Sequence, residues 1–122
     1  MKKLLNLSIS SNKKLNFKKE KFQTLIIGVR EAKALDGDLK SINEVTNGTI
    51  KKLISREEIT GKIGNSVYLP AINGVNAEKS YFIGTGKKSK KISEMDYFKI
   101  CQSISSAALA SKSSSVKIII PE

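Results

Sequence analysis

The sequence predicts an α/β domain, in which strands and helices alternate along the chain. Residues 24–29 form a continuous apolar run rich in branched side chains, as in a central strand covered on both faces. Residues 80–85 form a second apolar strand that runs into a Gly84-Thr85-Gly86 turn, and an amphipathic stretch begins near Ser93. A chain of 122 residues is long enough to bury a core, so we expect one domain spanning residues 1–122.

The first half of the chain predicts two strands and one helix. Residues 5–9 alternate apolar and polar side chains, which indicates a half-buried strand before a polar loop over residues 12–21. Asp36-Gly37-Asp38 is a turn and a helix start, with carboxylates near the positive end of the helix dipole. We expect one helix from there to Ile54, and we expect Gly48 within it to pack closely against the sheet. Its predicted face comprises Leu39, Ile42, Val45, Thr46, Thr49, Ile50, Leu53 and Ile54.

The second half predicts a hairpin, a helix and a last strand. Residues 66–70 form a strand, Asn73-Gly74 provides the turn, and residues 80–85 return beside it. Ser93 is the expected N-cap of a helix, with Asp96 as its capping partner and a hydrophobic staple between Ile92 and Tyr97. Residues 116–120 form the final strand. The predicted buried stripe of the helix is Tyr97, Ile100, Cys101, Ile104, Ala107 and Ala108.

A net charge of +11 raises the question of nucleic-acid binding. Only Arg30 and Arg56 are arginine, so 20 of the 22 basic residues are lysine, whereas readers of bases and phosphates favour the bidentate guanidinium. No aromatic residues are interleaved, at the spacing that base stacking needs, with the lysine pairs at 13–14, 18–19, 51–52, 87–88 and 90–91. Solvated lysine faces and a general compositional bias are the favoured interpretation, and a basic nucleic-acid-binding module is an alternative.

The segment Gly84-Thr85-Gly86-Lys87-Lys88 resembles a phosphate-binding loop but fails both standard patterns. A Walker loop needs a glycine where Tyr81 stands and a Ser or Thr where Lys88 stands. A dinucleotide fingerprint needs a third glycine where Ser89 stands. We therefore predict a strand-to-loop turn here, and a stand-alone module that binds ADP-ribose at this turn is a second alternative.

The residue types of a catalytic or metal site are scarce. The close carboxylate pairs are Asp36 with Asp38 and Glu57 with Glu58, and neither pair has a third ligand at metal-binding spacing. Without histidine, a Ser-His or Cys-His nucleophile is impossible within the chain. Cys101 falls on the predicted apolar stripe, where a buried thiol is inert. We predict no catalytic, cofactor-binding or metal-binding residue among these 122.

Several features predict a cytoplasmic protein without a membrane segment. The single cysteine excludes an internal disulfide and favours a reducing compartment. Met1-Lys2-Lys3-Leu4-Leu5 begins like a signal peptide, but Asn6 and Ser8 interrupt the apolar run at once. The sequence has no apolar run near 20 residues. The chain ends at Pro121-Glu122 without another cap or turn, so we expect it to be part of a longer protein.

Three glycine-containing motifs occur in one order and at one spacing. They are Thr46-Asn47-Gly48-Thr49-Ile50, Glu58-Ile59-Thr60-Gly61-Lys62-Ile63-Gly64-Asn65 and Tyr81-Phe82-Ile83-Gly84-Thr85-Gly86-Lys87. In this respect the chain resembles the N-terminal domain of the leucyl (cytosol) aminopeptidase family, over roughly residues 4–121. The resemblance implies a macro-domain-like fold, with a mixed central sheet of about five or six strands flanked by helices.

The same resemblance implies a non-catalytic role for this domain. The family's two-metal exopeptidase machinery, with divalent ions of the zinc or manganese type, lies in a separate C-terminal domain, and its motifs match nothing in this chain. The resemblance further implies that the N-terminal domain contacts its own catalytic domain, helps to build a homo-hexamer and shapes access to the active sites. In some members the N-terminal domain also contributes to DNA binding.

Overall fold

The computed structural model describes residues 6–10, 21–31, 35, 37–87 and 91–120, and for residues 6–10 it describes the backbone only. Most of the loop predicted for residues 12–21 therefore lies outside the described residues. Among the described residues, no helix is both long and apolar enough to cross a membrane.

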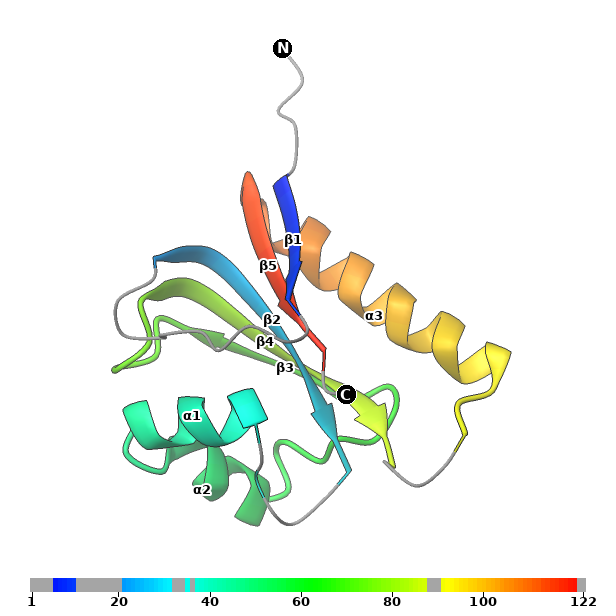
Figure 1. Ribbon diagram of the computed structural model, residues 1–122, viewed down its shortest axis with the longest axis horizontal. Coiled ribbons are helices and arrows are strands. Elements are labelled where there is room, and N and C mark those ends of the chain that lie inside the picture. Colours follow the sequence, from blue (N-terminus) through cyan, green and yellow to red (C-terminus); the bar gives the residue numbers. More distant parts are fainter. Residues whose placement is uncertain (1–5, 11–20, 32–34, 36, 88–90, 121–122) are drawn as a thin grey trace.

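One mixed sheet organises the domain (Figure 1), which confirms the predicted α/β class. Its strands lie in the order β1 (Asn6–Ser10), β5 (Ser115–Ile119), β2 (Phe22–Arg30), β4 (Ala77–Gly86) and β3 (Ser66–Pro70). The first four are parallel to their neighbours, and β3 pairs antiparallel with β4 at the edge. The strand predicted at residues 24–29 is β2, which lies at the centre of the sheet and is buried on both faces.

Helices cover both faces of the sheet. Helices α1 (Gly37–Val45) and α2 (Thr49–Ser55) lie on one face, and α3 (Glu94–Ser111) lies on the other (Figure 1). Each face has its own core, because successive side chains of a strand point to opposite faces. The core beneath α1 and α2 includes Leu25, Ile27, Val29, Ile42, Ile50 and Phe82. The core beneath α3 is smaller and consists of Ile26, Tyr81, Ile83, Ala107, Ala108, Val116 and Ile118.

The predicted hairpin is confirmed. Ser66 pairs with Ile83 and Pro70 with Lys79 across β3 and β4, and the turn includes Gly74 at φ +102°. The N-cap is also confirmed, because the Ser93 side-chain oxygen accepts a hydrogen bond from the Asp96 amide at 3.1 Å.

The prediction of one helix through Gly48 is wrong, because α1 and α2 are separate helices. Asn47 and Gly48 both have left-handed backbone conformations, with φ of +57° and +82°, and two such residues in succession end a right-handed helix. The Thr46 hydroxyl donates to the Ile42 carbonyl at 2.8 Å within this break. A methyl group added at Gly48 would meet nothing within 4 Å. Backbone conformation, and not close packing against the sheet, therefore explains this glycine.

The predicted buried stripe of α3 is partly wrong. Ile100, Ala107 and Ala108 are buried and Ile104 packs against them, but Tyr97 is 64% exposed and Cys101 is also exposed. Cys101 lies on the flank of the strip through which α3 contacts the sheet. Tyr97 is in line with that strip, but it lies in the first turn of the helix, before Ile100, the first buried residue of α3. The prediction that Cys101 is a buried thiol is therefore wrong, and its inertness stays a prediction. The proposed staple is not a buried contact either, since Ile92 is 49% exposed.

Candidate functional site

The glycine turn at the end of β4 is joined to neighbouring loops by backbone hydrogen bonds, and we call it a structural joint. The amide of Gly84 donates to the Asn65 carbonyl and the amide of Gly86 donates to the Gly61 carbonyl, each at 2.9 Å. The Gly86 carbonyl in turn accepts from the Glu31 amide at 3.0 Å. A phosphate cradle needs free amides that point at the ligand. Because these two amides already have partners, the geometry supports the predicted strand-to-loop turn.

Close backbone approach explains why Gly84 carries no side chain. A Cβ atom at this position would lie 1.9 Å from the carbonyl oxygen of Lys62, far inside contact distance. The loop that follows α2 therefore presses directly on β4. The glycine-containing motifs at residues 58–65 and 81–87 thus contact each other through their backbones.

The predicted carboxylate pairs form no recognisable site among the described residues. Asp38 lies half-buried in the first turn of α1, and burial raises the pKa of its carboxyl. Asp36 lies outside the described residues. Glu57 and Glu58 are exposed where α2 ends. Within the described part of the chain, no three His, Cys, Asp or Glu side chains gather closely enough to hold a metal ion.

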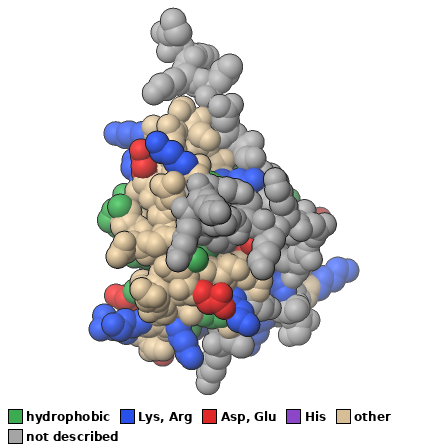
Figure 2. Space-filling model, turned by 60° about the vertical axis from the view of Figure 1, so that its left-hand side comes forward, with side chains coloured by type: hydrophobic (Ala, Val, Ile, Leu, Met, Phe, Trp, Pro, Cys, Tyr) green, Lys and Arg blue, Asp and Glu red, His purple; other side chains and the backbone are tan. Residues whose placement is uncertain are grey.

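Basic side chains are spread over the surface. Of the predicted lysine pairs, Lys51 and Lys52 lie wholly within the described residues, and both are exposed on α2. Figure 2 shows one face of the domain, on which Lys and Arg side chains stand apart, with acidic and uncharged side chains between them. A nucleic-acid path requires a continuous basic groove or stripe, and the described side chains on this face do not form one.

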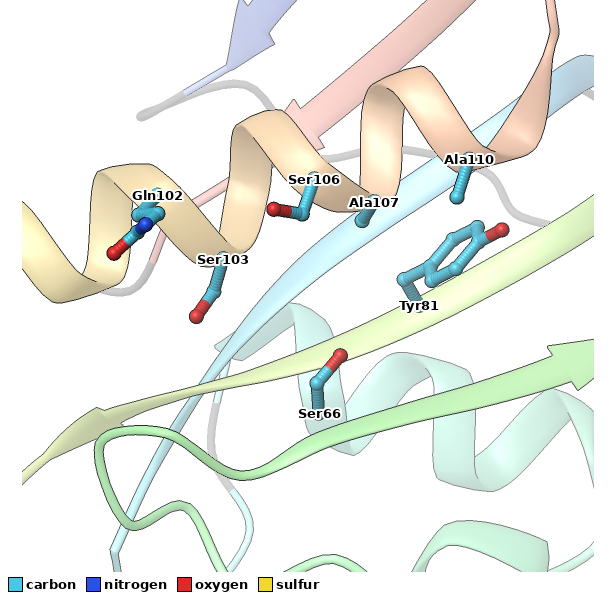
Figure 3. A pocket seen from close by; sticks show the side chains of 7 residues that line it. All are labelled: Ser66, Tyr81, Gln102, Ser103, Ser106, Ala107 and Ala110. Carbon is cyan, nitrogen blue, oxygen red and sulfur yellow. The ribbon is translucent and has the colours of Figure 1, made fainter.

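A groove of about 390 Å³ lies between α3 and the strands β3 and β4 (Figure 3). Small and polar side chains of α3 form one wall, and Ser66 of β3 and Tyr81 of β4 lie across from them. The ring of Tyr81 packs against that of Tyr68, with ring centroids 4.9 Å apart. The residues lining the groove are Ser66, Tyr81, Gln102, Ser103, Ser106, Ala107 and Ala110.

The lining of this groove is uncharged. Its lining offers hydroxyl groups, one amide and methyl groups, and it includes no charged side chain. Burial raises the pKa of the Tyr81 phenol, and the neighbouring Tyr68 raises it further, so Tyr81 is neutral at physiological pH. No lining residue is an acid or base near neutral pH. Our prediction from sequence missed the groove, although small residues at 103, 106, 107 and 110 of one predicted helix were an available signal.

These features define a class of protein domain: a mixed α/β domain whose glycine turns are structural and whose described residues present an uncharged groove. Comparison with known proteins gives the family. Residues 26–122 match the model of the cytosol aminopeptidase family, N-terminal domain. The chain therefore belongs to this family, as its N-terminal domain, and the resemblance predicted from sequence is confirmed.

Curated relatives carry the same name. The chain is 27% identical over 84 residues to the cytosol aminopeptidase of Pseudomonas aeruginosa, which covers 69% of this chain and 17% of that protein. It is 31% identical over 68 residues to a probable cytosol aminopeptidase of Burkholderia mallei, which covers 56% of this chain and 14% of the relative. The chain thus spans about one sixth of the length of these relatives.

A solved structure supports the fold. A mutant of tomato leucine aminopeptidase superimposes with a TM-score of 0.65 at 22% identity, over 96% of this chain and 23% of that one. At this level of identity the similarity concerns the fold alone. The comparisons favour neither the nucleic-acid-binding module nor the ADP-ribose-binding module.

Proposed function

We propose that this chain serves as the non-catalytic N-terminal domain of a two-metal leucyl aminopeptidase that releases N-terminal amino acids from peptides. One observation carries the proposal: the family match runs from residue 26 to residue 122, yet the chain spans only 17% of a curated aminopeptidase. The remaining four-fifths of such an enzyme has ample room for the catalytic machinery.

The chemistry of the described residues agrees with this division of labour. Two divalent ions of the zinc or manganese type need several carboxylate or histidine ligands. The chain has no histidine, and its described acidic side chains do not gather into a group that could hold a metal. The residues of this domain do not fit the metal pair, which we place in the remainder of the enzyme.

The role proposed for this domain is assembly and substrate access. Its uncharged groove and its exposed apolar side chains suit contact with other protein surfaces better than chemistry. We further propose that the complete enzyme is a cytoplasmic homo-hexamer. A relationship of the fold to macro domains stays a prediction.

The test is the size and activity of the polypeptide that carries this domain in its own cells. An antibody raised against the domain should detect a band several times heavier than the 13.4 kDa of this chain. The captured protein should release leucine from a chromogenic leucyl substrate, lose that activity with a chelator and regain it with zinc or manganese. The 122-residue chain assayed alone, with the same metals, is the matched control and should release none.

Two outcomes would contradict the proposal. A band at 13.4 kDa would mean that the domain works alone. Leucine release by the 122-residue chain itself would mean that the domain is catalytic.

A further inference from the structure

Beyond Lys99, which is exposed, the side of α3 that faces away from the sheet lacks the charges expected of an exposed helix surface. Charged residues make up 27% of the chain, yet from Ile100 to Ser111 the helix has none. A surface helix normally places charged and polar side chains opposite its buried stripe. Here the large side chains on the side away from the sheet are Met95, Phe98 and Leu109, which are 67%, 63% and 75% exposed.

These side chains form one seam along the helix. Residues 95, 98, 102, 105 and 109 follow one another at intervals of three, four, three and four, which keeps them on one face. Ile100, Ala107 and Ala108 lie on the opposite face, against the sheet. The same spacing marks the stripe through which one helix packs on another. We call Met95, Phe98, Gln102, Ser105 and Leu109 the outer seam of α3.

The uncharged surface continues beyond the seam. Ser106 and Gln102 border the groove between α3 and the strands, and Tyr68 on β3 is 46% exposed beside it. Figure 1 shows α3 lying along one side of the domain, with no described element outside it. The groove gives this surface a hollow of about 390 Å³, into which a side chain of a docked partner can fit.

The net charge of this chain and the length of its relatives indicate what covers the outer seam of α3. Each copy of this chain carries +11, so pairing two copies through α3 would bring 22 positive charges together without compensation. The relatives, in contrast, are about four times as long as this chain, since an 84-residue match covers 17% of one and a match over 96% of this chain covers 23% of another. Contact with that larger part does not bring two +11 domains together, and the seam itself is neutral.

We propose that the outer seam of α3 docks on an uncharged, apolar helix face in the catalytic part of the aminopeptidase. This inference rests on the proposed function, because it requires the larger polypeptide. The seam is the contact through which the domain is held against the catalytic part, and the groove receives a side chain at its margin.

Cysteine labelling in the full-length enzyme tests the proposal. Cys101 is first replaced by serine, a change at an exposed position. Leu109→Cys then reports on the seam, and Ser55→Cys on the exposed end of α2 is the matched control on the opposite layer. The rate of maleimide labelling at each site is read by mass spectrometry of the peptide that carries it, and is normalised to the rate in urea.

Both sites are exposed in this domain, so labelling at equal rates in the native enzyme would overturn the proposal. We expect labelling at Leu109→Cys to be at least about tenfold slower than at Ser55→Cys, because reagent access governs the reaction. Phe98→Cys is a second reporter on the same seam, in case Leu109→Cys does not fold. A disulfide joining the Leu109→Cys sites of two subunits would show that a second copy of α3 covers the seam, and would also overturn the proposal.

The experiments distinguish a failure of the proposed function from a failure of the docking proposal. If no larger polypeptide exists, the antibody experiment reveals it before any labelling is done. If the larger enzyme exists and is active but the seam labels rapidly, only the docking proposal fails.

Discussion

Replacing Gly84 with alanine tests whether the glycine turn is a backbone joint. Gly84 has no positive φ, so alanine fits its backbone conformation, and the cost is steric. The new Cβ would lie 1.9 Å from the Lys62 carbonyl oxygen, which forces the loop after α2 away from β4. Such overpacking costs about 1–3 kcal/mol. The shift also strains two hydrogen bonds, from Gly84 to Asn65 and from Gly86 to Gly61, worth about 0.5–1.5 kcal/mol each.

The expected loss in the free energy of unfolding is therefore about 2–6 kcal/mol, a large part of the roughly 5–15 kcal/mol typical of a domain. Gly48→Ala is the matched control. Its effect on the unfolded chain is the same, and its added Cβ meets no atom within 4 Å. We therefore expect it to lower the free energy of unfolding by only about 1–2 kcal/mol, for placing alanine in a left-handed backbone conformation. Urea unfolding of both variants, followed by far-UV circular dichroism, gives the two values. If Gly84→Ala costs no more than Gly48→Ala, the loop yields freely and the joint is not rigid.

Four further predictions concern the cap, the tyrosine and the two rejected ligands. Ser93→Ala should lower the free energy of unfolding by about 0.5–2 kcal/mol in the same urea assay, because it removes the bond to the Asp96 amide, whereas Ser93→Asp should retain the stability. Since the pKa of Tyr81 is raised above its ordinary 10.0, the folded state holds this proton more tightly than the unfolded state does. Stability should therefore fall as pH rises above about 10, and Tyr81→Phe should reduce that slope; an unchanged slope would contradict the assignment. ADP-ribose titrated into the chain should give no heat, because the Gly84 and Gly86 amides are already bonded. Duplex DNA should show no detectable binding at low salt, and binding with a log-log salt slope of several phosphates would restore the nucleic-acid hypothesis.

Local patterns predicted most of the fold. Branched apolar runs located β2 and β5, and residues 66–70 were predicted with the bounds that β3 has. Ser93 identified the start of α3 because capping depends on a few neighbouring residues. The strand order could not be predicted in this way, since it depends on contacts between residues far apart in the sequence.

The errors arose where helical periodicity alone was used. The apolar spacing from Leu39 to Ile54 is compatible with one helix, but the left-handed Asn47 and Gly48 divide it into two. Tyr97 and Cys101 fit a helical stripe, yet Cys101 lies beside the strip that contacts the sheet, and Tyr97 precedes Ile100, the first buried residue of α3. The groove was missed because it requires knowing that β3 lies at the edge of the sheet, beside β4 and across from α3. Periodicity predicts that a face is apolar, and it does not predict what covers that face.

Because lysine is so common in this sequence, the lack of charge along the outer seam of α3 is informative. Lysines occupy exposed positions across the described surface, including Lys40 on α1, Lys51 on α2 and Lys62 in the following loop. If composition alone filled exposed positions, lysines would continue along the outer side of α3 beyond the exposed Lys99. Instead, twelve consecutive residues of α3, from 100 to 111, carry no charge, and the seam presents Phe98 and Leu109 to solvent. A surface that avoids the commonest exposed residue of its own chain is best explained by contact with another protein surface, which is the contact that the labelling experiment measures.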